Sequence, residues 1–315
     1  MKLHKKLIAI LATVLCLMLI TACGGTKKDE TDSSKKSKEI TLTDAMGEVT
    51  LPANPERILA SNLEDSLVSL DIIPAAQWSI GESVHAYLQD ALGNVPTIAW
   101  DMPLEQVIEK DPDLIIFSSP SAIPSGTYEE YKKIAPVYVF KDEDSSDWRK
   151  QLQIMGQIVG KEKQAKEELA AYETKAKDAS EKLKKAIGDE SVAAIWIIGG
   201  QYYLLENERF SANVLYKDLQ LTQPNMIKNM PAAKDATWSP ISLEALSDLD
   251  ADHVFLIAAK GEAGLQALTN STVWKQLPAA KNKQVYELED DGSWTINGRI
   301  ASEKVIDTVT KTLVK

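Results

Sequence analysis

Aromatic side chains are the residues of this sequence whose types and positions best suit the binding of a ligand. The chain has seven tryptophans beside only four phenylalanines. Several tryptophans and tyrosines lie at the ends of predicted strands or in loops, where ligands bind in α/β proteins. Those that we predict to line a binding cleft are Tyr87, Trp100, Trp196, Tyr202, Trp238 and Trp294, with Tyr203 beside them. For any one of them, packing in the core is an equal alternative.

The sequence offers little for catalysis or for direct metal binding. It contains no G-x-S-x-G motif, phosphate-binding loop, C-x-x-C or H-E-x-x-H motif, so a hydrolase has no support. A bare transition metal needs three or four converging His and carboxylate ligands. Beyond residue 22 only His85 and His253 remain, and His253 lies in a predicted buried strand. We therefore expect a binding protein without a catalytic residue, direct metal ligand or cofactor, although His85 or a tyrosine could be an axial ligand of haem.

The N-terminus predicts export and a lipid anchor. Residues 1–22 combine a basic start, an apolar run and closing small residues, a pattern typical of a signal peptide and too short for a transmembrane helix. Ile20-Thr21-Ala22 before Cys23 resembles the bacterial lipobox, which predicts a lipid on Cys23; the alternative is an ordinary secretory signal with an incidental cysteine. Residues 23–38 are polar and predict a flexible tether.

Charge and cysteine content narrow the partners further. Loss of the three lysines of the signal peptide moves the formal net charge from −11 to about −14. An acidic exported domain binds nucleic acid and anionic lipid surfaces poorly. We therefore expect the lipid on Cys23 to provide the membrane attachment. Cys16 is removed with the signal peptide, and Cys23 alone cannot form an internal disulfide.

Two blocks of alternating strand and helix patterns predict an α/β fold with mainly parallel sheets. The first lobe covers 39–160 and the second lobe covers 188–315. A long helix over 161–187 joins them, with an apolar stripe formed by Ala165, Leu169, Tyr172, Ala176, Ala179, Leu183 and Ile187. The helix has no internal Gly or Pro, which predicts a rigid connection. Trp148 and Trp274 lie in other helical patterns and are expected to pack in the core.

An internal repeat relates the two lobes. Residues 104–115 align without gaps on 243–254, and both copies carry Leu-Glu at the start of a predicted helix and Asp-x-Asp before a strand. Any helix-turn-strand unit would share part of this pattern. Packing does not require the glutamates Glu105 and Glu244, which therefore indicate a matched pair of exposed acids, one in each lobe.

Several short motifs occur in an order and spacing that resemble one family of transport proteins. They include Asn54-Pro55-Glu56-Arg57-Ile58 and Asp111-Pro112-Asp113. The others lie at 20–23, 104–117, 210–215, 241–246, 274–277 and 280–286. Together they resemble the substrate-binding lipoprotein of a Gram-positive ABC importer, of the class whose two Rossmann-like lobes are joined by one rigid helix. Members of that class bind ferric siderophores, haem or vitamin B12.

The resemblance implies a place and partners for this chain. It implies a monomer held by its lipid on the extracytoplasmic face of the cell membrane. The ligand is captured between the lobes with a small closure, and is delivered to a permease driven by a cytoplasmic ATPase. Glu105 and Glu244 match the glutamates that meet arginines on the two permease subunits.

The scarcity of basic residues then favours one ligand class. The family binds anionic catecholate and citrate complexes of iron through several Arg and Lys, but no basic residue occurs between Ser191 and Glu208. Of four arginines, Arg209 and Arg299 remain for a ligand, each with a surface role as an equal alternative. We expect an iron(III)-siderophore complex of hydroxamate type, with iron held by the siderophore. Haem or cobalamin is the alternative ligand, and a surface sensor or adhesin is the alternative function.

Overall fold

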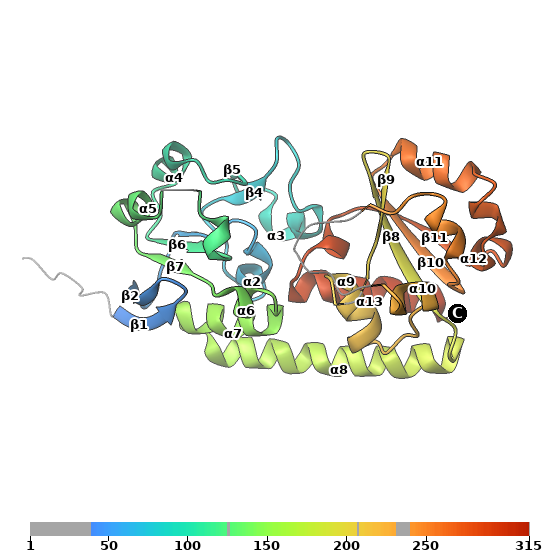
Figure 1. Cartoon of the computed structure of the whole chain (residues 1–315). Helices are drawn as coiled ribbons and strands as arrows, with labels where there is room; N and C mark the ends of the chain where they lie inside the picture. The colour runs from blue at the N-terminus through green and yellow to red at the C-terminus, as the bar shows by residue number, and fades with distance from the viewer. Residues whose placement is uncertain (1–38, 125–126, 207, 231–239, 315) are drawn as a thin grey trace, which may run out of the picture. The chain divides into compact units, whose positions relative to one another are not determined.

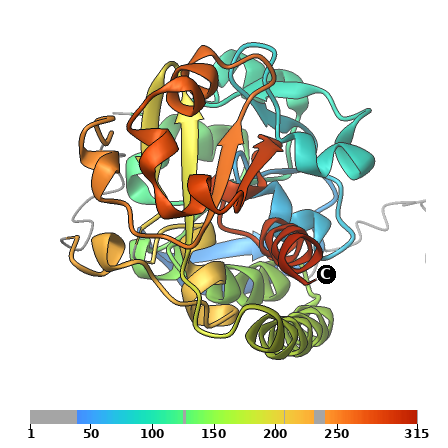
Figure 2. The ribbon, with the colours of Figure 1, turned by 90° about the vertical axis from the view of Figure 1, so that its right-hand side faces the viewer.

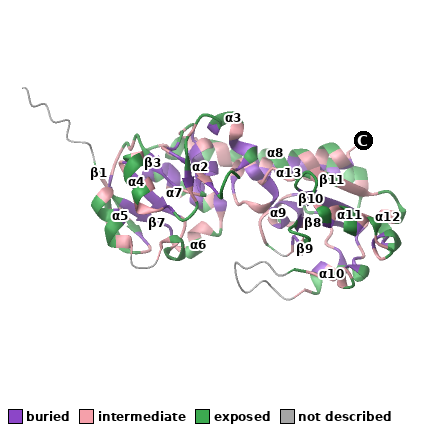
Figure 3. Cartoon of the chain, turned by 90° about the horizontal axis from the view of Figure 1, so that it is seen from above, coloured by how far each residue is buried: buried purple, intermediate pink, exposed green. Residues whose placement is uncertain are grey.

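The computed structural model of the chain describes residues 39–124, 127–206, 208–230 and 240–314. All of these belong to one compact unit. Figure 1 shows strands and helices alternating through the first lobe, the long helix α8 and the second lobe, so the predicted α/β fold class is confirmed. Figure 3 shows that buried residues gather in the strands of both lobes, while the outer helices carry exposed residues.

A hairpin opens the described chain, as predicted. Strands β1 (Glu39–Asp44) and β2 (Gly47–Pro52) pair antiparallel. Asp44 is buried, and its carboxylate accepts hydrogen bonds from the N–H of Met46 at 2.7 Å and of Val139 at 2.9 Å. This carboxylate therefore fixes the hairpin to β7 (Val137–Val139) of the first lobe.

The first lobe contains short parallel strands covered by helices. Its three-stranded sheet has the order β3-β6-β7, and β4 and β5 form a separate parallel pair. The remaining strands are β3 (Ile58–Leu59), β4 (Gln77–Ser79), β5 (Thr97–Ala99) and β6 (Leu114–Phe117). The helices are α2 (Glu64–Val68), α3 (Gln89–Leu92), α4 (Leu104–Lys110), α5 (Tyr128–Ile134) and α6 (Asp142–Ser145). Sequence reasoning missed β4 because its sequence Gln-Trp-Ser places one apolar residue between two polar ones and forms no apolar run.

Helices α7 (Trp148–Ile158) and α8 (Glu162–Ile187) lead from one lobe to the other. Gly160 separates them with a φ of +68°, the left-handed conformation expected of a glycine that ends a helix. A Cβ on Gly156 would lie 2.8 Å from the Cβ of Ala165, so the two helices touch where only glycine fits. Helix α8 extends about 39 Å at about 1.5 Å per residue.

The apolar stripe of α8 lies where the sequence predicted it. Ala165, Tyr172, Ala176, Ala179 and Leu183 are buried, and Leu169 and Ile187 are partly buried against the same core. The helix packs on α7 of the first lobe and on α13 (Arg299–Leu313) of the second lobe. Figure 2 shows α13, in dark red, lying beside α8. One helix face therefore contributes to the cores of both lobes.

The second lobe has longer strands in the order β11-β10-β8-β9. Strands β8 (Val192–Ile198), β10 (His253–Ala258) and β11 (Val285–Glu289) are parallel, and β9 (Gln201–Leu204) returns antiparallel after the Gly199-Gly200 turn. The other helices are α9 (Ser211–Asn213), a π-helical turn over Val214–Asp218, α10 (Asn225–Lys228), α11 (Ala263–Asn270) and α12 (Pro278–Lys281). Trp274 of this lobe is buried in the core, as expected, and so is Trp148 of α7.

The internal repeat has a physical basis in its second aspartate. In the first lobe the carboxylate of Asp113 accepts the N–H of Glu56 and of Arg57, just before β3. In the second lobe the carboxylate of Asp252 accepts the N–H and hydroxyl of Ser191, just before β8. Each aspartate precedes one strand and anchors the start of its parallel neighbour.

The helical part of the repeat differs between the lobes. Residues 104–110 form α4, as predicted. The prediction of a helix over 243–249 is wrong: only a 3₁₀ turn forms there, at Ala245–Asp248. Ser247 and Asp248 stand where α4 has Ile108 and Glu109. Ser and Asp side chains compete with the helical hydrogen bonds of the backbone, which shortens the element.

Candidate functional site

A pocket of about 640 Å³ lies at the carboxyl ends of strands in the first lobe. Ser61 and Asn62 follow β3, Trp100 and Asp101 follow β5, and Ser118 follows β6. The rest of its lining is Trp78, Ser121, Ala122, Ile123 and Pro124. This is the edge of a parallel sheet at which α/β proteins bind ligands, and the volume suits a small molecule.

Other hollows of the described surface fit a ligand less well. Four of them, between about 430 and 810 Å³, all include side chains of α8. Lysines and acidic residues of α8 line most of them, and they lie away from the carboxyl ends of the strands. In the hollow beside α7, Arg149 is already bonded to Glu173 and Asp218. The pocket at the strand ends is therefore the candidate site.

Trp100 lies in this pocket, as predicted. It directly follows β5, and 61% of its surface is exposed, which is unusual for so large an apolar side chain. Its backbone N–H donates to the carbonyl of Ser79 at 2.9 Å, so the turn that carries it is attached to β4. An indole fixed in this way offers an open aromatic face to a ligand.

Trp78 is a pocket residue that sequence reasoning missed, because it lies on the unrecognised strand β4. Its ring stacks on the imidazole of His85, with centroids 4.4 Å apart and planes 7° from parallel. His85 Nε2 lies 3.0 Å from Oδ1 of Asn62, another lining residue. Burial lowers the pKa of His85 to about 4, so the ring beneath Trp78 is neutral at physiological pH.

A buried carboxylate also positions Trp78. Glu64 is 1% exposed, and its Oε1 accepts the N–H of Trp78 at 2.6 Å. Burial raises the pKa of Glu64 to about 7, although hydrogen bonds from backbone N–H groups oppose that shift. The wall of the pocket therefore rests on a carboxyl group that titrates near neutral pH.

Trp196 is a partly buried residue of β8 in the second lobe. Its ring is 5.5 Å from that of Tyr203, and its Nε1 donates to Asp290 at 2.7 Å. Asp290 belongs to the loop after β11, and a Cβ on Gly292 of that loop would lie 3.8 Å from Nδ1 of His85. Because His85 stacks on Trp78, this loop connects the aromatic residues of the two lobes.

The sheet separates Tyr202 from Trp196. Tyr203 pairs with Trp196 in the register of β8 and β9, and Tyr202 pairs with Ile197 on the opposite face. The hydroxyl of Tyr202 donates to the carbonyl of Gly264 at 3.2 Å. Of the two tyrosines, Tyr203 therefore lies on the sheet face that carries Trp196, and a ligand role for Tyr202 stays a prediction.

Two further aromatic residues are buried and do not line the pocket. Trp294 is 3% exposed and packs against Phe255, with ring centroids 5.5 Å apart. Tyr87 is 6% exposed, and its backbone N–H donates to the carbonyl of Asp291. For both, the packing alternative describes the structure better than an open cleft position, because tertiary contacts cover their rings. Trp238 and Cys23 lie outside the described residues.

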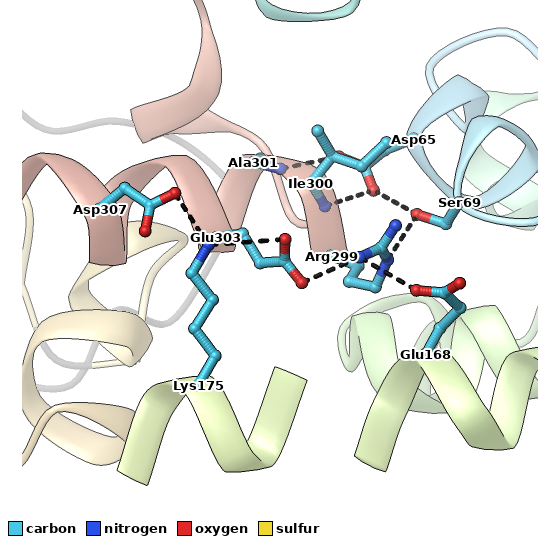
Figure 4. A network of polar contacts seen from close by, with 9 residues as sticks. All are labelled: Asp65, Ser69, Glu168, Lys175, Arg299, Ile300, Ala301, Glu303 and Asp307. Atoms are coloured by element: carbon cyan, nitrogen blue, oxygen red, sulfur yellow. Dashed lines mark hydrogen bonds and ion pairs between the residues drawn. The ribbon is translucent and has the colours of Figure 1, made fainter. Parts of the chain in front are cut away.

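Arg299 belongs to a polar network between the lobes (Figure 4). Its Nη1 lies 3.1 Å from Glu168 of α8 and 2.8 Å from Glu303 of α13, and its Nε donates to Ser69 Oγ at 3.2 Å. The expectation of an arginine that faces a ligand is corrected here, because carboxylates from two helices already bind its guanidinium group.

Asp65 completes this network from the first lobe. Its carboxylate accepts the N–H groups of Ile300 and Ala301 at 3.1 and 3.0 Å, at the N-terminus of α13 (Figure 4). A Cβ on Gly298 would lie between 2.2 and 2.6 Å from that carboxylate, so the close approach requires glycine. The first lobe therefore binds the positive end of a second-lobe helix.

Arg209 is paired within its own lobe. Its Nε lies 3.2 Å from Oε1 of Glu206, and both side chains are mostly buried. Burial raises the pKa of Glu206, while the charge of Arg209 opposes the shift. A ligand role for Arg209 stays a prediction.

Comparison with known proteins decides the family. Residues 84–291, about two thirds of the chain, match the model of the periplasmic binding protein family. The chain belongs to that family. This binding protein is a substrate-binding component of transport and not an enzyme.

The relatives cover nearly the whole length of this binding protein. The iron(3+)-hydroxamate-binding protein YxeB of Bacillus subtilis is 28% identical over 99% of this chain and 97% of its own. The iron-uptake system-binding protein of Bacillus subtilis is 30% identical over 90% of both chains. Among solved structures, the FhuD protein from S. pseudintermedius superposes with a TM-score of 0.72 at 24% identity, over 88% of this chain and 98% of that one. That structure shares the fold.

The two predicted docking glutamates are both exposed in this binding protein. Glu105 lies in the first turn of α4, and Glu244 directly precedes the 3₁₀ turn Ala245–Asp248. Their structural surroundings leave both carboxylates open to a partner. Exposure is what docking requires, and the docking role itself stays a prediction.

The described part of this binding protein contains neither a membrane-spanning helix nor a metal-binding cluster. No helix among the described residues is both long and apolar enough to cross a bilayer. No group of three or more His, Cys, Asp and Glu in the same ranges could hold a metal ion. His253, a residue weighed as a metal ligand, is buried and lies 2.6 Å from Glu190 and 3.1 Å from the hydroxyl of Tyr286.

Proposed function

We propose that this protein captures a ferric siderophore of hydroxamate type between its two lobes and delivers it to an ABC permease driven by a cytoplasmic ATPase. In this proposal Trp78 and Trp100 contact the ligand from the first lobe, and Trp196 and Tyr203 from the second. The protein acts as a monomer on the extracytoplasmic face of the cell membrane, held by a lipid on Cys23.

The observation that carries the proposal is the lining of the pocket. The lining residues that the structure describes include two tryptophans and no Arg or Lys. Catecholate and citrate complexes of iron are strongly anionic and require cationic partners, whereas a ferric trihydroxamate has little net charge. Its aliphatic arms pack well against aromatic faces. The name of the relative YxeB points to the same ligand class.

Haem and cobalamin are the second candidates, because an aromatic pocket without basic residues also suits a planar macrocycle. Haem requires an axial ligand, for which His85 was the histidine available in the first lobe. His85 is buried, stacked on Trp78 and bonded to Asn62. Ligation by His85 would require all three of these interactions to be rearranged, which favours the hydroxamate.

Tryptophan fluorescence tests the ligand class directly. The purified protein is titrated with ferrioxamine B, ferrichrome, a ferric catecholate, haem and cobalamin. We expect the hydroxamates to quench fluorescence with a Kd below about 1 µM, since Trp78 and Trp100 line the pocket. Quenching by haem or cobalamin alone would refute the hydroxamate proposal.

A transport assay tests the docking role. We expect the double variant Glu105→Ala and Glu244→Ala to bind the ligand with unchanged affinity and to lose most of its uptake, because both carboxylates lie outside the pocket. Glu109→Ala, on another exposed position of α4, is the matched control and should retain uptake. Unchanged uptake in the double variant would favour the alternative of a surface sensor or adhesin.

Cys23→Ser tests the anchor. We expect this variant to appear in the culture medium, because the lipid is the membrane attachment that we propose. Retention of the variant in the membrane fraction would contradict a lipid on Cys23.

A further inference from the structure

We infer that Asp101 makes the pocket selective for a ferric hydroxamate that carries a protonated amine. This inference rests on the proposed function and specifies which members of that ligand class bind best. Asp101 follows Trp100 at the rim of the pocket and is exposed. Among the lining residues that the structure describes, Asp101 is the one charged side chain.

The turn that carries Asp101 is held in place on both sides. Before it, Gln106 Oε1 accepts the N–H of Ala99 at 3.0 Å, and Trp100 donates to the carbonyl of Ser79 at 2.9 Å. After it, Met102 donates to the carbonyl of Ala99 at 2.8 Å, and the carbonyl of Met102 accepts the hydroxyl of Tyr131 at 2.6 Å.

Met102 also shows why this turn keeps one conformation. Its φ is +46°, which is unfavourable for a residue with a long side chain, yet that side chain is almost fully buried. The hydrophobic contacts of Met102 hold the strained backbone in place. Trp100 and Asp101 are therefore presented to a ligand without a prior ordering step.

The carboxylate of Asp101 is available for a cation. No hydrogen bond or ion pair to it occurs among the described residues. The acids of the loop after β11 in the second lobe are already engaged, because Asp290 accepts a hydrogen bond from Trp196 Nε1 and Asp291 lies 3.3 Å from Lys304 Nζ. Asp101 therefore differs from these acids in having no partner of its own in the described chain.

The neighbouring tryptophans favour the same kind of group. An ammonium group at the rim would meet the carboxylate of Asp101 and the exposed face of Trp100 together, so that Coulomb attraction and a cation–π contact add. The described part of the lining holds no lysine or arginine that would repel it. An uncharged amide at the same position would gain neither interaction.

A matched pair of ligands tests this selectivity. Ferrioxamine B has a protonated amine at one end, and its N-acetyl derivative has the same iron centre and arms without that charge. We expect the purified protein to bind ferrioxamine B between about threefold and tenfold more tightly than the acetylated form, the range typical of one solvent-accessible ion pair with an aromatic contact. Because added salt screens the charge, the preference should shrink in 1 M NaCl.

Asp101→Asn assigns the effect to this residue. We expect the variant to bind both ligands with the weaker affinity of the acetylated form, because Asn keeps the size of the side chain and removes its charge. Asp90→Asn, on an exposed residue of α3 outside the pocket lining, is the control and should keep the preference.

The outcomes separate this inference from the proposed function. Equal affinity of the unmodified protein for the two ligands, or a preference that survives in Asp101→Asn, would overturn the role of Asp101 and leave hydroxamate binding intact. Failure of both ligands to bind would overturn the proposed function and the inference together.

Discussion

The two lobes have the same alternation of strands and helices but differ in how deeply they bury carboxylate side chains. The first lobe buries Asp44, Glu64 and Asp65, each less than 5% exposed. Over the described residues of the second lobe, 188–206, 208–230 and 240–314, no Asp or Glu is buried to that extent. Burial of a carboxylate is costly unless hydrogen bonds compensate, so the difference requires a structural reason.

Strand length supplies that reason. Apart from the β1–β2 hairpin, the strands of the first lobe have two to four residues, whereas those of the second lobe have four to seven. Short strands leave backbone N–H groups without partners in the sheet, and buried N–H groups must be satisfied. In the first lobe Asp44 accepts from Val139 and Glu64 accepts from Trp78. In the second lobe the longer strands satisfy more of these N–H groups by hydrogen bonds within the sheet.

Asp65 is a buried carboxylate that accepts backbone N–H groups from the other lobe. It accepts two N–H groups of α13, next to the guanidinium group of Arg299 on the same helix. The rigidity expected from the unbroken helix α8 therefore has a second source in direct bonds between the lobes. These bonds support small closure on ligand binding over a wide opening.

Among these carboxylates, removal of Asp65 should lower the stability of the protein the most. Asp65→Ala leaves the N–H groups of Ile300 and Ala301 without their acceptor in a buried place, and we expect a loss of about 3 to 4 kcal/mol in the free energy of unfolding. Urea denaturation measures the loss. Asp90→Ala, which removes an exposed aspartate of the same lobe, should change it by less than about 0.5 kcal/mol. Equal losses in the two variants would show that buried carboxylates do not hold the first lobe together.

Glu64→Gln should change how the stability of the protein depends on pH. Burial raises the folded-state pKa of Glu64 from 4.5 to about 7, so the folded protein binds a proton that the unfolded chain has released between these values. The unmodified protein should therefore lose stability relative to the variant as pH rises from 4.5 to 7. The upper limit of the loss is roughly 3.4 kcal/mol, because the folded and unfolded pKa values differ by about 2.5.

Unfolding of both proteins at pH 4.5, 6 and 8 measures this difference. Gln keeps an oxygen that can accept the N–H of Trp78, so the variant isolates the charge. His85, which stacks on Trp78, is present in both proteins and does not affect the comparison. A difference independent of pH would contradict a titrating Glu64.

Asp113 and Asp252 should show the smallest effects and the greatest similarity between lobes. Each anchors the first residues of a parallel strand through two hydrogen bonds. We expect Asp113→Ala and Asp252→Ala to cost about 1 to 2 kcal/mol each in unfolding free energy, with Asp→Asn at either position costing less because one acceptor remains. A loss confined to one lobe would mean that the repeated aspartates have different roles.

Sequence reasoning predicted most of the regular elements and fewer of the site residues. Helices α4 and α8 and strands β6 and β10 have strong periodic or continuous apolar patterns, and their bounds agree with prediction to within one residue. Strand β4 has a single apolar residue between two polar ones and carries no such pattern, so Trp78 was missed. Trp100 was found because it follows a recognisable strand.

The burial of individual aromatic residues was not predictable in the same way. Trp294 and Trp100 both follow strand patterns, yet one packs on Phe255 and the other is open. Tyr202 and Tyr203 are neighbours in sequence, and only the pairing of β9 with β8 places Tyr203 beside Trp196. Arg299 looked available because its partners Glu168 and Ser69 are far away in the chain.

By itself, the sequence determined the α/β class, the long joining helix, the repeated aspartates and the transport family, because each depends on local periodicity or on motifs in a fixed order. The tertiary structure decided which tryptophans are open, which arginine is already paired and which carboxylates are buried. Those properties depend on contacts between residues far apart in the chain, such as Asp65 with Ile300 and His85 with Gly292. Local sequence patterns carry no record of such contacts.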